Sequence, residues 1–242
     1  MPFSKSTLKQ REDFYKNKFD VAKIRKFLPF KPQFFVIDSG TETGIIKNKK
    51  NMGKLIIMNP DISYIELKKQ LIDYLPEDVY YDRNIYMDPK KCFKNFNFRT
   101  AFSSDNFLGQ QLAFDIDPEN LINSGSLWSF NKDLIIKTSR ITLEFYKELK
   151  NHFKEIRIVY SGRGFHLHVF DKEAYKLSLS ERKDLNEKFM KYKIDPWVSH
   201  GKVRLIRLPY SLNSLCSRIC TPISMQELKS FNPDKKKYLI EK

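Results

Sequence analysis

The chain has 242 residues, of which 41% are hydrophobic and 14% aromatic, so disorder, collagen and coiled coil are excluded as descriptions of the whole chain. Its 44 Lys and Arg outnumber its 29 Asp and Glu, and the net charge of +15 favours a polyanionic partner, with nucleic acid ahead of a membrane surface. No apolar stretch approaches the roughly 20 residues that cross a bilayer, and no apolar signal segment follows Met1. We therefore expect no membrane partner and a cytoplasmic location, at the nucleoid if the source is prokaryotic.

The three cysteines form an odd number, which does not build a disulfide framework and suits a reducing compartment. Cys216 and Cys220 are near enough in sequence to share a metal ion. A closed zinc site, however, needs about four ligands, and only Cys92 and four histidines remain as distant candidates. A structural zinc ion is therefore not expected.

In the first half of the chain, residues 6–28 predict one or two helices, because apolar residues recur among charges before Pro29. Asp61 and Ser63 can cap a helix that runs to about residue 73. Runs rich in β-branched and aromatic residues predict strands at 34–37, 55–58, 79–87 and 111–116, with a polar, aromatic loop before the last of them.

In the second half, residues 132–153 form the clearest predicted helix, with apolar side chains at helical spacing and no internal Gly or Pro. Capping boxes begin two more helices, at Ser178 with Glu181 and at Ser224 with Glu227. Strands are expected at 156–160, 165–170, 202–208 and 220–223. With no repeat and no convincing linker, the pattern predicts a single mixed α+β domain over residues 1–242.

Two carboxylates stand at the end of the strand expected at 111–116. Side-chain alternation places Asp115 and Asp117 on one face and the apolar Phe114 and Ile116 on the other. Neighbouring like charges are costly unless one group is protonated or a cation lies between them, and carboxylate oxygens suit Mg²⁺ or Mn²⁺. A strand that simply ends in a polar turn has the same pattern, so both interpretations stay open.

A glycine turn with phosphate-compatible donors joins the next two strands. Gly162 and Gly164 allow close approach of a ligand to the backbone, and Ser161, Arg163 and His166 are donors suited to phosphate oxygens. A tight hairpin also needs glycine, but so many suitable groups within six residues favour anion binding.

The third chemistry-bearing segment, residues 194–209, contains Asp195 and three cations. Arg204 and Arg207 point to opposite faces of the predicted strand, so one of the two is expected to be only structural.

Three segments resemble, in order, the motifs of the small catalytic subunit of archaeal and eukaryotic DNA primases: Phe-Asp-Ile-Asp at 114–117, Tyr-Ser-Gly-Arg-Gly-Phe-His at 160–166 and Leu-Ile-Arg-Leu-Pro-Tyr-Ser-Leu at 205–212. The similarity covers roughly residues 13 to 235. It implies a palm-like, RRM-related catalytic domain with a mixed β-sheet and flanking helices. The implied activity is synthesis of short primers on a single-stranded DNA template from NTPs, with dNTPs as the alternative substrate.

By motif position, the resemblance implies that Asp115, Asp117 and Asp195 are the catalytic carboxylates. They would hold two Mg²⁺ or Mn²⁺ ions that activate the attacking 3′-hydroxyl and neutralise the leaving pyrophosphate. The resemblance also implies that the incoming nucleotide is bound by Ser161, Gly162, Arg163, Gly164, His166, Arg207 and Asn213.

The chain departs from the family's pattern at several points. Relatives usually have two consecutive arginines where this chain has only Arg163, and a histidine where it has Asn213, so weaker triphosphate binding is expected. Relatives also carry a longer segment before the third carboxylate and a Cys/His zinc motif. We therefore expect a minimal primase core that forms a heterodimer with a large subunit, for which the family precedent contains an iron–sulfur cluster.

Two other functions compete with a replicative primase. One is a repair-type primase-polymerase like the end-joining polymerases, which share an Asp-x-Asp-Pro such as Asp115 to Pro118; the segment from Arg207 to Pro209 favours the replicative primase. The other is a non-catalytic module that binds single-stranded nucleic acid. The three carboxylates together with His166 argue against that module, because a purely structural fold has no need for clustered acids.

Overall fold

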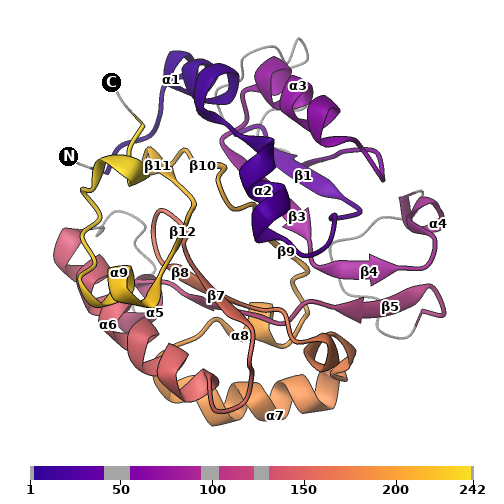
Figure 1. Cartoon of the computed structure of the whole chain (residues 1–242), viewed down its shortest axis with the longest axis vertical. Helices are drawn as coiled ribbons and strands as arrows, with labels where there is room; N and C mark the ends of the chain where they lie inside the picture. Colours follow the sequence, from indigo (N-terminus) through magenta and orange to yellow (C-terminus); the bar gives the residue numbers. More distant parts are fainter. Residues whose placement is uncertain (1–2, 41–54, 94–103, 123–130, 241–242) are drawn as a thin grey trace.

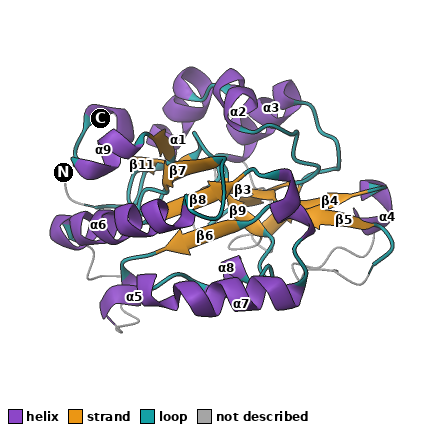
Figure 2. Ribbon diagram, turned by 60° about the horizontal axis from the view of Figure 1, so that its bottom comes forward, coloured by secondary structure: helices purple, strands orange, loops and turns teal. Residues whose placement is uncertain are grey.

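The computed structural model describes residues 3–40, 55–93, 104–122 and 131–240. Within these residues the strands form a six-stranded sheet, a four-stranded sheet and a separate two-stranded ladder (Figure 1). Helices α1, α2 and α3 lie on one side of the strands, and α5, α7 and α8 lie on the other (Figure 2). The mixed α+β architecture expected from the sequence is confirmed. The expectation of a single domain stays a prediction.

The N-terminal half contains most of the six-stranded sheet. Its elements are α1 (Leu8–Asp13), a π-helical turn (Phe14–Lys18), α2 (Val21–Phe27), β1 (Phe35–Asp38), β2 (Leu55–Ile57), α3 (Tyr64–Tyr74), β3 (Asp78–Asp82), β4 (Asn84–Tyr86), α4 (Pro89–Phe93), β5 (Phe107–Gln110) and β6 (Ala113–Ile116). Of the two expected caps of α3, only Ser63 serves, since its hydroxyl accepts a hydrogen bond from the N–H of Glu66 at 3.1 Å. Asp61 lies outside the helix, at a positive φ of 62°.

The single strand expected at 79–87 is wrong, because the chain switches sheets at Arg83. β3 belongs to the six-stranded sheet, whereas β4 pairs with β5. The buried guanidinium of Arg83 donates to the carbonyls of Gln111 and Val198, at 2.8 and 2.9 Å, and so ties this switch to distant segments. α4 and β5 occupy parts of the expected loop, and residues 94–103 of that loop lie outside the described residues.

The C-terminal half completes both sheets. Its elements are α5 (Glu119–Ile122), α6 (Lys132–Leu149), β7 (Ile156–Tyr160), β8 (Phe165–Val169), α7 (Leu179–Phe189), α8 (Pro196–Ser199), β9 (Leu205–Arg207), β10 (Leu212–Asn213), β11 (Arg218–Ile219), β12 (Thr221–Ile223) and α9 (Met225–Lys229), with 3-10 turns at Lys172–Lys176, Met190–Tyr192 and Lys236–Tyr238. Both predicted capping boxes are present, at the starts of α7 and α9. The expected strand at 202–208 is shorter than predicted and is limited to β9.

The two sheets have antiparallel neighbours throughout. The larger has the order β11-β10-β3-β1-β2, and β9 also pairs with β3. β3 thus pairs with β10 at Asp78 and with β9 from Tyr80 to Asp82. The smaller sheet has the order β12-β7-β8-β6, in which Asp115 stands opposite His166. This register brings the predicted carboxylate strand beside the predicted phosphate-binding hairpin.

Two clusters of buried apolar side chains form the core. In one, Phe114 and Ile116 of β6 and the apolar face of β8 pack with Phe145 of α6 and Phe189 of α7. In the other, the first helices and α3 pack on the larger sheet, and Ala113 of β6 joins them. The alternation predicted for β6 is therefore confirmed.

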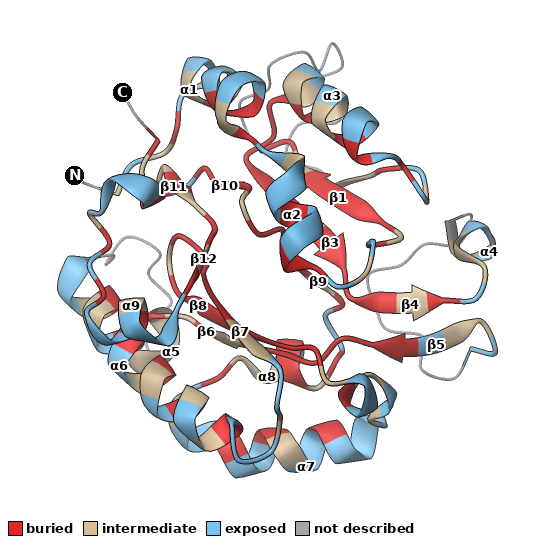
Figure 3. Cartoon of the chain, in the orientation of Figure 1, coloured by how far each residue is buried: buried red, intermediate tan, exposed pale blue. Residues whose placement is uncertain are grey.

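Figure 3 shows buried strands and helices whose outer faces are exposed. Among the described helices, none has the length and apolar character needed to cross a membrane.

Candidate active site

A cavity of about 250 Å³ lies between the two sheets. Strands β3, β9 and β10 of the larger sheet contribute to its wall, and β6 and β8 of the smaller sheet contribute the rest together with α8 and the loops beside these elements. The lining residues are Tyr80, Asp115, Asp117, Ser161, Arg163, His166, Asp195, Val198, Val203, Leu205, Ile206, Arg207 and Asn213. Every site residue predicted from the sequence lines this cavity except Gly162 and Gly164, although their roles stay predictions.

The third carboxylate reaches the first through backbone contacts. The N–H of Asp195 donates to the carbonyl oxygen of Asp115 at 2.8 Å. Asp195 is also the N-cap of α8, where its Oδ1 accepts a hydrogen bond from the N–H of Trp197 at 2.8 Å. Pro196 suits the first helical position that follows, because its missing N–H has no partner there in any case. The Asp-Pro sequence thus begins a short helix with its carboxylate held at the cavity wall.

Burial and mutual repulsion perturb the two carboxylates at the end of β6. Burial raises the pKa of Asp115 well above its usual range, and the nearby Asp117 and Asp195 raise it further. Burial also raises the pKa of Asp117, although Arg163 and Arg207 oppose the change. The Oδ1 of Asp115 is buried and has no hydrogen-bond partner among the described residues. These groups would gain from a cation placed between them.

The donor set fits a hard divalent cation, because Asp115, Asp117 and Asp195 offer only carboxylate oxygens. An unsatisfied, buried carboxylate oxygen is the atom that such an ion would contact. Within the described residues, however, no three His, Cys, Asp or Glu side chains are already arranged to hold a metal ion.

The glycines of the turn allow it to pack tightly against both sheets. A Cβ atom on Gly164 would lie 2.4 Å from the Oδ1 of Asp117 and 2.4 Å from the carbonyl of Ile116. Gly162 has a φ of +98°, and a Cβ there would lie 2.9 Å from the Cβ of Asn213. The hydroxyl of Ser161 accepts a hydrogen bond from the N–H of Gly164 at 3.0 Å. The glycines thus serve close contact with protein atoms, where the sequence alone suggested close contact with a ligand.

Each arginine of the cavity faces a carboxylate that sequence reasoning did not assign to it. Arg163 forms an ion pair with Glu119 of α5, and Arg207 forms one with Asp78 of β3. The hydroxyl of Tyr80 donates to Asp78 at 3.2 Å, and the guanidinium of Arg207 lies 5.4 Å from the Tyr80 ring centroid. One sequence pattern could have indicated each of these carboxylates. Glu119 directly follows the Asp-x-Asp-Pro segment, and Asp78 alternates with Tyr80 along the strand.

Arg204, by contrast, does not line the cavity. It is buried, and its Nε lies 3.3 Å from Asp82. The expectation that Arg204 and Arg207 point to different places, and that one of them is structural, is confirmed.

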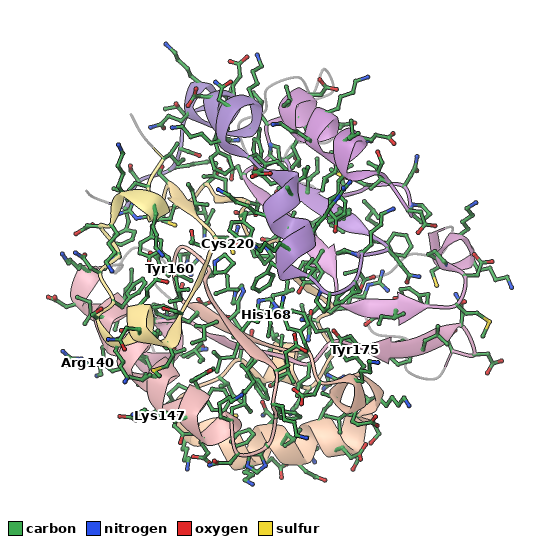
Figure 4. All side chains as sticks on the ribbon, in the orientation of Figure 1. Arg140, Lys147, Tyr160, His168, Tyr175 and Cys220 are labelled. Atoms are coloured by element: carbon green, nitrogen blue, oxygen red, sulfur yellow. The ribbon has the colours of Figure 1, made fainter. Side chains whose placement is uncertain are left out.

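Both histidines of β8 are buried, and only His166 reaches the cavity. Burial, with Arg207 and Arg83 nearby, lowers the pKa of His166 to about 3, so its ring is neutral and carries one N–H. Its Nε2 lies 3.5 Å from the Oδ1 of Asp115. His168, labelled near the middle of Figure 4, is instead fully buried, and its Nδ1 lies 3.1 Å from the hydroxyl of Tyr81 on the larger sheet. The pattern of alternate histidines therefore contributes one cavity residue and one core residue.

Asn213 connects the glycine turn to the larger sheet. Its Nδ2 donates to the carbonyl of Ser161 at 3.1 Å, and its buried Oδ1 has no hydrogen-bond partner among the described residues. Cys216 supports the same turn by donating from its thiol to the carbonyl of Gly162 at 3.2 Å. Asn213 thus holds the turn in place at the cavity wall.

A comparison with curated proteins decides the family. The chain is 40% identical to an uncharacterized DNA primase small subunit-like protein of Archaeoglobus fulgidus, over 94% of this chain and 88% of that protein. The chain belongs to the DNA primase small subunit family. The DNA primase small subunit of Pyrobaculum calidifontis is a more distant relative, 26% identical over 68% of this chain and 65% of its own length.

The fold of this member of the DNA primase small subunit family is also found among solved structures. It is similar to the polymerase domain of Mycobacterium tuberculosis ligase D, solved in complex with DNA, with a TM-score of 0.54. The alignment covers 97% of this chain and 86% of that domain at 12% identity, so it bears on the fold alone. No family model matches the chain. The expected primase-polymerase type of α+β fold is confirmed.

Proposed function

We propose that this chain is a DNA primase: a nucleotidyltransferase that joins NTPs into short primers on a single-stranded DNA template by two-metal-ion chemistry. The observation that carries the proposal is the convergence of Asp115, Asp117 and Asp195 with Arg163 and Arg207 on one cavity. Membership of a family whose relatives are named DNA primase small subunits supports it.

The charge of each group in the cavity indicates its proposed role. Asp115, Asp117 and Asp195 would hold two Mg²⁺ or Mn²⁺ ions, which supply Lewis-acid stabilisation of the attacking 3′-oxygen and the leaving pyrophosphate. Arg163 and Arg207 would contact the triphosphate, because guanidinium groups bind phosphate oxygens with paired hydrogen bonds. In the nucleotide-free chain, Glu119 and Asp78 pair with these two arginines, so the triphosphate would have to compete with both carboxylates for them.

The neutral groups of the cavity would position the nucleotide. His166 donates one hydrogen bond at neutral pH without adding a charge, because its pKa lies near 3. The turn from Ser161 to Gly164 is held against β6 and β10, so its backbone presents a rigid edge to the phosphates. Such preorganisation stabilises developing charge without a cost in rearrangement at the moment of reaction.

A large primase subunit is the proposed protein partner, because the relatives of this chain are named as small subunits. Single-stranded DNA and NTPs, or dNTPs, are the proposed substrates. The net charge of +15 supports a polyanionic template.

The decisive experiment is synthesis on unprimed single-stranded DNA with labelled NTPs or dNTPs and either Mg²⁺ or Mn²⁺. Wild type should give short products that disappear in Asp115→Ala/Asp117→Ala, while Asp184→Ala, on the exposed face of α7, should keep wild-type activity. Products that form only from a supplied primer would favour the repair-type polymerase. No product, alone or with a candidate large subunit, would contradict nucleotidyl transfer.

A further inference from the structure

An exposed tryptophan stands directly beside the carboxylate that begins α8. Trp197 is 59% exposed, although its neighbours Asp195 and Val198 line the cavity. The Trp197 side chain itself is not part of the cavity wall, so its ring lies at the rim and faces solvent. Tryptophan has the largest apolar surface of any side chain, and leaving most of it in water forgoes favourable burial. An exposed ring at this position is therefore suited to contact with another molecule.

A cation and a second apolar residue accompany this ring. The Nζ of Lys202 lies 5.1 Å from the Trp197 ring centroid, and among the described residues that exposed lysine has no carboxylate partner. The N–H of Val203 donates to the carbonyl of Trp197 at 3.0 Å, and Val203 is 39% exposed and also lines the cavity. We call Trp197, Lys202 and Val203 the rim cluster.

The backbone around the rim cluster is anchored from two sides. The guanidinium of Arg83 donates to the carbonyl of Val198 at 2.9 Å, and the side-chain amide of Gln110 donates to the carbonyl of Gly201 at 3.1 Å. Both donors are buried. The ring and the ammonium group are thus presented from a fixed backbone, which lowers the entropic cost of binding a ligand.

We propose that the rim cluster binds the single-stranded DNA template, with the indole of Trp197 stacked on an unpaired base and the ammonium of Lys202 at a neighbouring phosphate. Stacking on an aromatic side chain beside a cation is a general means of holding single strands. A polymer fits this place better than a mononucleotide does, because the ring faces outward from the cavity in which Arg163 and Arg207 lie. The inference rests on the proposed primase function and names a contact for its template.

The test measures binding of a short labelled oligo(dT) by fluorescence anisotropy at fixed low salt, without nucleotides or synthesis. Trp197→Ala should weaken binding about tenfold, whereas Trp197→Phe should keep most of the affinity. Lys202→Gln should weaken binding and lower the slope of log affinity against log salt by about one. The matched control is Ile65→Ala, because Ile65 is 78% exposed on α3 and should not affect binding.

A second readout reports on the ring itself. The chain has two tryptophans, so Trp128→Phe leaves Trp197 as the only indole, and stacked bases should quench its fluorescence when oligo(dT) is added. Unchanged oligo(dT) affinity in Trp197→Ala would overturn the proposal, whatever Lys202→Gln does. So would weakened binding of a labelled nucleoside triphosphate, with oligo(dT) binding intact, in Trp197→Ala.

These outcomes are separable from those of the synthesis assay. If Trp197→Ala loses oligo(dT) binding while wild type makes no product under any condition, the rim cluster stands and primase activity fails. If wild type makes products and Trp197→Ala binds oligo(dT) normally, primase activity stands and the rim cluster fails.

Discussion

The backbone N–H of Asp195 donates a hydrogen bond of 2.8 Å to the carbonyl oxygen of Asp115. This contact joins the start of α8 to a strand of the smaller sheet, although the two residues are far apart in sequence. It places the third carboxylate beside the first without using either carboxylate as a hydrogen-bond partner of the other. Both acidic groups therefore stay available for a cation, at the cost of their mutual repulsion.

The repulsion predicts that Asp115→Asn stabilises the protein in the absence of divalent ions. Asp115 has a raised pKa in the folded state, so its ionisation costs stability as pH rises above its ordinary value of 3.8. At pH 7 we therefore expect the free energy of unfolding of Asp115→Asn to be larger than that of wild type. Urea unfolding in the presence of a chelator measures this difference, and Asp184→Asn is the control. An unchanged or lower stability would contradict the inferred repulsion.

Divalent ions should reverse this difference in stability, so that wild type becomes more stable than Asp115→Asn. Mn²⁺ or Mg²⁺ that binds only the folded protein should raise the melting temperature of wild type, with an increase that grows with ion concentration. Asp115→Asn/Asp117→Asn should lose this increase, and Asp184→Asn should keep it. Thermal unfolding across an ion titration makes the comparison, and an equal shift in all three proteins would count against a metal site at these carboxylates.

Gly164→Ala should destabilise the chain by about 1–3 kcal/mol, the usual cost of adding an atom to a packed site. Its Cβ would lie 2.4 Å from both the Oδ1 of Asp117 and the carbonyl of Ile116, and the second of these is backbone that does not move freely. Urea unfolding measures the loss. If Gly164→Ala unfolds at the same urea concentration as wild type, the turn has more room than its packing indicates.

The ion pair between Arg163 and Glu119 predicts a gain in nucleotide affinity when the carboxylate is removed. Glu119→Gln should bind nucleoside triphosphate a few-fold more tightly, because a partly exposed ion pair contributes up to about 1 kcal/mol that triphosphate binding must replace. Arg163→Gln should bind more weakly. Titration with a fluorescent nucleotide analogue tests both variants; weaker binding by Glu119→Gln would instead make that carboxylate a positioning group for the arginine.

His168 predicts a loss of stability in mild acid. Burial, then His166 and Arg83, hold its pKa well below the ordinary 6.5, so the unfolded chain binds a proton that the folded chain does not. The free energy of unfolding therefore falls as the pH drops below about 6.5. His168→Phe should lose less of this free energy between pH 7 and pH 5, although it no longer contacts the hydroxyl of Tyr81.

Urea unfolding at the two pH values checks this expectation. His152→Gln is the matched control, because His152 is exposed and should leave the acid dependence of wild type intact. An unchanged acid dependence in His168→Phe would mean that His168 is protonated in the folded state.

Local patterns were enough to predict most elements near the site. The alternation of Phe114 and Ile116 against Asp115 is a property of any half-buried strand, so the sequence alone predicted which side chains share a face. The glycine turn and the capping boxes depend on neighbours within a few residues, and they too were predictable. The strand at 79–87 was not, because its division at Arg83 depends on carbonyl groups of Gln111 and Val198 that only the folded chain brings near.

The sequence by itself determined the chemistry that this protein carries: two carboxylates at one strand end, a third after residue 194, and a glycine turn with Ser161, Arg163 and His166. The tertiary structure decided how these groups meet. Pairing of β6 with β8, and of β3 with β9 and β10, encloses one cavity and places Glu119 and Asp78 against its two arginines. Such partners come from elements distant in sequence, and hydrophobic burial and sheet register, which act between those elements, select them.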